Sequence, residues 1–139
     1  MNKIVKLLIY ILIPLLGGFL IGIISNTDNY SLFVPPVIFP IVWTILYVLM
    51  GISSYLIKRD GGNLFLYYTQ LIVNFLWPIV YFNLNLKLLA LIILITLIIL
   101  VINMINYFKK INEFASKIQI PYLIWLSFAL FLNIISFLY

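Results

Sequence analysis

Long apolar segments separated by short polar ones dominate the chain. Five segments hold roughly 20 mainly apolar residues each, the length that an α-helix needs to cross the hydrocarbon core of a bilayer. The pattern predicts an all-α membrane protein, a bundle of five transmembrane helices that forms a single domain over residues 1–139. We place the helices at about residues 5–24, 36–57, 64–82, 86–108 and 118–138, with turn-forming or charged residues in the connections 25–31, 58–63, 83–87 and 109–117.

The composition agrees with this pattern. Of 139 residues, 66% are hydrophobic and only 8% are charged. The mean hydropathy is +1.26. A soluble domain of this size needs far more polar surface, so we expect an integral, multi-pass membrane protein in contact with lipid.

The basic residues indicate the topology. With five spans, the N-terminus and the second and fourth connections lie on one side of the membrane, and the positive-inside rule makes that side the cytoplasm. We therefore predict a cytoplasmic N-terminus in a bacterial cell membrane, and an outward-facing first connection (25–35) that could cover a site as a lid. The cations form no continuous basic face, so we expect no nucleic-acid partner. The inner side holds Lys3, Lys6, Lys58, Arg59, Lys109, Lys110 and Lys117, and the outer side holds Lys87.

Missing residue types restrict the chemistry. The chain has no Cys and no His, which removes thiol nucleophiles and the commonest metal ligands. Its carboxylates, Asp28, Asp60 and Glu113, all fall in predicted connections, so an ion-coupled transporter lacks a buried acid. We expect no metal, no cofactor and no conventional catalytic residues.

Two stripes of polar and aromatic residues stand out from the apolar background. In FVPPVIFPIVWTILYVLMG (33–51) the prolines suit a helix start, and Trp43 and Tyr47 then follow on one face. In QLIVNFLWPIVYF (70–82), Gln70, Asn74, Trp77 and Tyr81 recur at helical spacing. A buried amide in lipid is costly unless it is paired, so the second stripe should face protein.

A third stripe lies in PYLIWLSFALFLN (121–133), where Trp125, Ala129 and Leu132 follow one line. Ser127 and Asn133 add hydrogen-bonding groups to this segment. All three stripes fit two interpretations: helix packing with polar side chains between helices, or the walls of a ligand pocket.

Two further patterns concern packing. The run LLALIILITLIILVI (88–102) is uniformly apolar, which is typical of a lipid-facing helix, and we give it no chemical role. Gly18 and Gly22 form a small-xxx-small spacing that suits a close contact between helices, within one chain or between two.

Three motifs in the same order resemble one known family. PPVIFPIVWTILYVLMG (35–51), QLIVNFLWPIVYF (70–82) and PYLIWLSFALFLN (121–133) are similar to segments of the TspO/MBR family, the tryptophan-rich sensory proteins related to the mitochondrial translocator protein once called the peripheral benzodiazepine receptor. The resemblance implies a five-helix bundle, usually a homodimer, whose pocket binds porphyrins such as protoporphyrin IX and isoquinoline-carboxamide or benzodiazepine-type ligands. It places pocket positions on Trp43, Asn74, Trp77, Trp125, Ala129 and Leu132.

The resemblance leaves three functions open. The first is a sensor or regulator of porphyrin or oxidative stress, in which the pocket, with Tyr47 beside Trp43, binds a tetrapyrrole. The second is light-dependent porphyrin breakdown, in which Trp43 and Trp125 are redox-active. The third is passage of a hydrophobic ligand across the membrane. Sterol recognition is not implied, because Ile134 stands where the animal proteins carry a Tyr of the cholesterol-recognition pattern.

Overall fold

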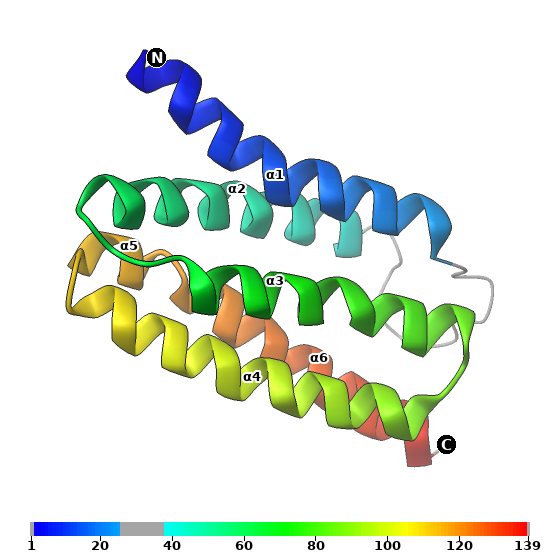
Figure 1. Ribbon diagram of the computed structural model, residues 1–139. Helices are drawn as coiled ribbons and strands as arrows, with labels where there is room; N and C mark the ends of the chain where they lie inside the picture. Colours follow the sequence, from blue (N-terminus) through cyan, green and yellow to red (C-terminus); the bar gives the residue numbers. More distant parts are fainter. Residues whose placement is uncertain (1, 26–37, 139) are drawn as a thin grey trace.

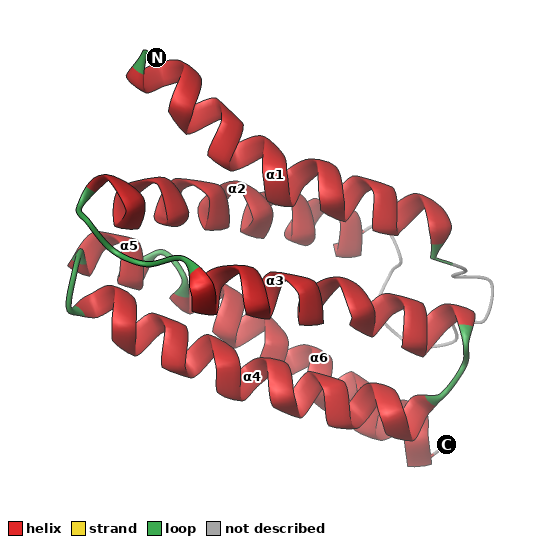
Figure 2. Ribbon diagram, viewed as in Figure 1, coloured by secondary structure: helices red, strands yellow, loops and turns green. Residues whose placement is uncertain are grey.

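The computed structural model describes residues 2–25 and 38–138, and within these residues the chain is helical with short connections (Figures 1 and 2). Five helical stretches are long and apolar enough to cross a membrane. The predicted all-α fold is confirmed. The elements are α1 (Lys3–Ile24), α2 (Ile38–Arg59), α3 (Phe65–Pro78), the π-helical turn η2 (Ile79–Asn83), α4 (Lys87–Lys109), α5 (Glu113–Lys117) and α6 (Ile120–Leu138).

The helices alternate in direction, as five consecutive spans require. Asn112 Nδ2 donates to Asp60 Oδ2 at 2.8 Å, which joins the second and fourth connections at one end of the bundle. At the other end, Asn83 Nδ2 donates to the carbonyl of Ile24 at 2.7 Å. The two termini lie at opposite ends (Figure 1). The lid predicted for the first connection falls almost entirely on residues 26–37, outside the described residues.

Prolines mark helix starts because the first N–H groups of a helix have no intrahelical acceptor. Pro121 is the second residue of α6 and Pro40 is the third of α2. Pro78 lies instead inside a continuous helical stretch, where its missing N–H leaves the carbonyl of Asn74 without an i+4 donor. The chain widens there into η2, and the N–H of Leu84 donates to the carbonyl of Ile79 at 3.0 Å. The helix predicted through Tyr81 is therefore π-helical after Pro78, and Trp77 and Tyr81 still stack on one another as members of one stripe.

Glycines bring α1 close to α2 and α3. A Cβ on Gly51 would contact the backbone of Ile11 in α1 and lie 2.8 Å from its nitrogen. A Cβ on Gly18 would lie 2.6 Å from Cδ2 of the Tyr47 ring. A Cβ on Gly22, in contrast, would meet no atom of another described element within 4 Å. Of the predicted small-xxx-small pair, Gly18 thus makes a contact within the chain, and Gly22 does not take part.

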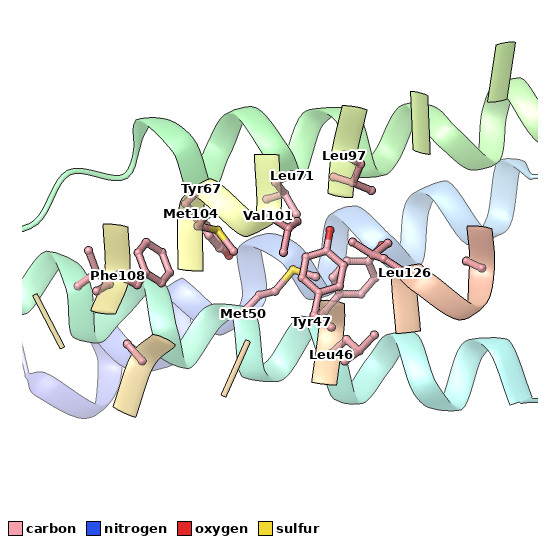
Figure 3. Packing of buried hydrophobic residues seen from close by; sticks show 14 of the residues in the cluster. Leu46, Tyr47, Met50, Tyr67, Leu71, Leu97, Val101, Met104, Phe108 and Leu126 are labelled. Atoms are coloured by element: carbon pink, nitrogen blue, oxygen red, sulfur yellow. The ribbon is translucent and has the colours of Figure 1, made fainter. Parts of the chain in front are cut away.

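The lipid-facing character predicted for residues 88–102 applies to one side of α4, where Ile92, Ile95 and Ile99 are exposed. One face of α4 is buried against α3 and α6, and its side chains join those of α2 in the central cluster (Figure 3). The buried positions recur at alternating spacings of four and three residues, as in a helix that packs along a seam. They are Ala90, Leu94, Leu97, Val101, Met104 and Phe108.

The fourth connection contains a short helix, α5, where the sequence suggested only a loop. The Asn112 side chain caps it by accepting from the N–H of Ala115 at 2.9 Å. Ser53 Oγ of α2 donates to the Ala115 carbonyl at 2.8 Å. This bond fixes the start of α6 relative to α2, and so it positions the aromatic residues that follow on both helices.

Candidate functional site

Four aromatic rings meet between the first half of α2 and the first half of α6. Trp43 is at the centre: it stacks on Tyr47 with ring centroids 5.4 Å apart. It also meets Tyr122 edge to face at 6.2 Å and Trp125 at 6.5 Å. We call Trp43, Tyr47, Tyr122 and Trp125 the aromatic cluster. Its two indoles remain half-buried, whereas its two phenols are buried, which suits a flat apolar ligand at its open side.

A chain of hydrogen bonds runs inward from this cluster. Tyr47 Oη donates to Asn74 Oδ1 at 2.8 Å. Asn74 Nδ2 donates to Tyr122 Oη at 2.7 Å, and Tyr122 Oη donates to Gln70 Oε1 at 2.7 Å. All three bonds point the same way, so the Tyr47 oxygen remains free to accept a hydrogen bond at the cluster. This polar chain connects α2, α3 and α6, as the prediction that the amides of α3 face protein requires.

A second group surrounds Trp77, near the C-terminal end of α3. Trp77 Nε1 donates to Asn133 Oδ1 at 3.0 Å, and Asn133 Nδ2 donates to the carbonyl of Lys87 at 3.2 Å. The Trp77 ring stacks on Tyr81 at 4.9 Å. The Lys87 ammonium lies over the Tyr81 ring, 3.4 Å from the centroid of that ring. Lys87, the cation that the sequence analysis predicts for the outer side, therefore lies beside Trp77 of the predicted site.

The structure brings most of the predicted site residues together. Tyr47 and Ala129 are buried in one core cluster, and Trp43, Trp77 and Trp125 pack against it. Asn74 joins them through its bonds to two of the phenols. Leu132 is buried on α6, beyond Ala129. Ser127, in contrast, is exposed and donates to the carbonyl of Leu123 in its own helix, so it lies outside the site.

Tyr122 is the residue that sequence reasoning missed. Its side chain is only 1% exposed, and it takes part in both the aromatic cluster and the polar chain. A signal was present, because Tyr122, Ala129 and Asn133 recur at spacings of seven and four residues on one face of α6. The sequence analysis instead selected the neighbouring line of residues that contains Trp125.

The two indole nitrogens of Trp77 and Trp125 differ. Trp77 Nε1 is bonded to Asn133, whereas Trp125 Nε1 is buried and has no hydrogen-bond partner in residues 2–25 and 38–138. Burying a donor without an acceptor costs free energy. Within the aromatic cluster, the N–H of Trp125 is thus available to donate a hydrogen bond.

This difference predicts that two matched substitutions lower the free energy of unfolding by different amounts. Trp77→Phe keeps a ring but leaves Asn133 Oδ1 without its donor, and we expect a loss of about 1 kcal/mol in the free energy of unfolding. Trp125→Phe removes only the unpaired N–H, and the ligand-free protein should lose little stability through hydrogen bonding. Unfolding in mixed detergent micelles measures both variants. Equal losses would contradict the assigned bonding.

Comparison with known proteins agrees with the geometry. The sequence pattern of the TspO/MBR family matches residues 7–138, which is nearly the whole chain. The chain belongs to the TspO/MBR family. In this TspO/MBR member the residues of the aromatic cluster lie in the three motifs that resemble the family, and so do Trp77, Tyr81 and Asn133.

Relatives come from bacteria and from animals. The tryptophan-rich protein TspO of Chlorobaculum tepidum is 31% identical over 106 residues, which cover 71% of this chain and 67% of the relative. The tryptophan-rich sensory protein of Cereibacter sphaeroides is also 31% identical, over 71% of this chain and 65% of its own length. The bovine translocator protein is 31% identical over 142 residues, 89% of this chain and 83% of the relative. This TspO/MBR member is accordingly an integral, multi-pass membrane protein.

Proposed function

We propose that this TspO/MBR member binds a tetrapyrrole of the protoporphyrin IX type at the aromatic cluster and acts as a sensor or regulator of porphyrin stress. The observation that carries the proposal is the buried N–H of Trp125, which has no hydrogen-bond partner among the described residues and belongs to one of the two half-buried indoles of the cluster. An unpaired donor in an apolar wall is the group that a ligand acceptor would satisfy.

The other polar features of the site complement such a ligand. The Tyr47 oxygen is left as an acceptor by the direction of the polar chain, and it can receive a pyrrole N–H. The Lys87 ammonium lies near the Trp77 group, where it can attract a propionate. The rings of Trp43 and Trp125 provide flat apolar area for the macrocycle.

Fluorescence titration with protoporphyrin IX in the dark tests the proposal. Trp43→Ala removes the central ring of the aromatic cluster, and we expect the affinity to fall at least about tenfold, which corresponds to roughly 1.4 kcal/mol. Trp125→Phe keeps a ring and removes only the N–H. We expect a smaller loss there, because one hydrogen bond contributes about 1 kcal/mol.

Each titration needs a control for nonspecific partitioning of porphyrin into detergent or lipid. Ser127→Ala serves this purpose, since Ser127 is exposed and bonded within α6. Saturable quenching that weakens in both Trp variants and not in Ser127→Ala supports the site. Linear quenching that is identical in all four proteins would refute porphyrin binding, while membership of the family would stand.

Light-dependent breakdown of the bound porphyrin is a second candidate. It is favoured by the contact of two oxidisable indoles, whose centroids are 6.5 Å apart, with Tyr47 stacked on one of them. Light and molecular oxygen would supply the reactivity that the side chains lack. If this function holds, Trp43→Phe should retain most porphyrin binding and lose turnover under illumination.

A further inference from the structure

Beyond the aromatic cluster, several buried polar atoms have no hydrogen-bond partner within the part of the chain that the structure describes. They are Tyr67 Oη, Gln70 Nε2, and both Nε2 and Oε1 of Gln119. Tyr67 is 1% exposed, and both glutamines are 0% exposed. The amide of Gln119 is therefore completely buried with neither of its polar atoms paired.

The helix register brings these atoms into one region. The bond from Tyr122 Oη to Gln70 Oε1 fixes α6 against α3. Tyr67 lies three residues before Gln70, and Gln119 lies three residues before Tyr122. Tyr67 is displaced from Gln70 by about 4.5 Å along α3. Because α3 and α6 run in the same direction and Gln119 immediately precedes α6, both residues lie toward the same end of the bundle, the end where α2 finishes.

The Tyr67 hydroxyl also lies near Ser54 of α2, although it completes no hydrogen bond among the described residues. Ser54 Oγ itself donates to the carbonyl of Gly51 at 2.9 Å, so its oxygen can still accept. Polar groups from α2, α3 and the start of α6 thus converge with unused donors and acceptors.

Such a set of atoms has the composition of a water site. An unpaired amide in the interior of a membrane protein is costly, whereas a buried water makes two to four hydrogen bonds to such groups. The unpaired atoms offer donors at Gln70 and Gln119, an acceptor at Gln119, and a hydroxyl at Tyr67 that can do both. We propose that Tyr67, Gln70 and Gln119 hold internal water molecules in the core of the bundle.

The water site continues the polar chain. The chain runs from Tyr47 through Asn74 and Tyr122 to Gln70, where the donor Nε2 is left over. A water that accepts from Gln70 Nε2 and bonds to Gln119 extends the chain by one more turn, toward the end of the bundle that carries Lys58 and Arg59. Water there also fixes the orientation of the Gln70 amide, and through it the direction of every bond up to the aromatic cluster.

Water-edited solid-state NMR of the full chain in liposomes tests the proposal directly. We expect rapid magnetisation transfer from water to the side-chain amides of Gln70 and Gln119. The side-chain amide of Asn133 is a matched internal control, since its two polar atoms bond to Trp77 and Lys87, and it should receive transfer much more slowly. Equally slow transfer to all three amides would overturn the proposal.

The substitution Gln119→Met provides a second test, because the direction in which it shifts the unfolding midpoint depends on whether water is bound. Methionine has a similar volume and no hydrogen-bonding amide. If water is bound, the variant leaves that water short of partners and the unfolding midpoint should fall by a few degrees. If the region is dry, removing an unpaired amide should raise the midpoint, because an apolar group of the same shape avoids its desolvation cost. A raised midpoint would refute the water site. Neither test depends on porphyrin binding.

Discussion

Gly51→Ala should lower the free energy of unfolding by about 3 kcal/mol, the upper part of the usual range for overpacking. The added Cβ would contact the backbone of Ile11 and lie 2.8 Å from the carbonyl oxygen of Tyr10. Both obstacles are backbone atoms, so no change of rotamer relieves them. The helix α1 must move away from α2, and unfolding in mixed detergent micelles should report the loss.

Gly22→Ala is the matched control, because Gly22 is also a helical glycine but its added Cβ would meet nothing within 4 Å among the described residues. Alanine favours a helix over glycine by up to about 1 kcal/mol, so this variant should be unchanged or slightly more stable. The two substitutions are chemically identical and should have opposite signs. A Gly51→Ala protein as stable as wild type would show that α1 does not pack on α2 at this point.

Asn74→Leu should cost about 2 kcal/mol by breaking the polar chain at its centre. Tyr47 Oη loses its acceptor and Tyr122 Oη loses one donor, while both hydroxyls stay buried. Tyr122 keeps Gln70 as its acceptor, so most of the loss falls on Tyr47. The same unfolding assay measures this variant.

A double-mutant cycle with Tyr47→Phe separates the lost hydrogen bond from changes in packing. In the Tyr47→Phe background no buried hydroxyl of residue 47 is left unpaired, so Asn74→Leu should cost about 1 kcal/mol less than in wild type. Purely additive effects of the two substitutions would contradict the bond between Tyr47 and Asn74.

The sequence was a good guide to the spans and to most of the candidate site. Apolar length alone placed the five helices within a few residues of their observed bounds. The stripe of Gln70, Asn74 and Trp77 faced protein as expected, because an amide in lipid needs a partner and the partner must come from another helix.

The errors have identifiable physical causes. In α4 the lipid-facing and buried faces are both apolar, so no periodic contrast reveals the buried seam from Ala90 to Phe108. The π-helical turn after Pro78 changes the spacing of the residues that follow. Gln119 was not selected from the sequence because it belongs to no stripe and lies alone before α6. Its burial without a partner among the described residues depends on how α5 positions that helix.

The sequence by itself determined that this protein spans a membrane with five helices and has no carboxylate within its predicted spans, because apolar length and residue types decide these matters locally. Only the tertiary structure decided which side chains meet. It connected Tyr122 to both Asn74 and Gln70, assigned a partner to the indole of Trp77 and none to that of Trp125, and left Gln119 unpaired in the core. These outcomes depend on the register between helices that are far apart in the chain. That register is set by the glycine contacts, the π turn after Pro78 and the short helix α5.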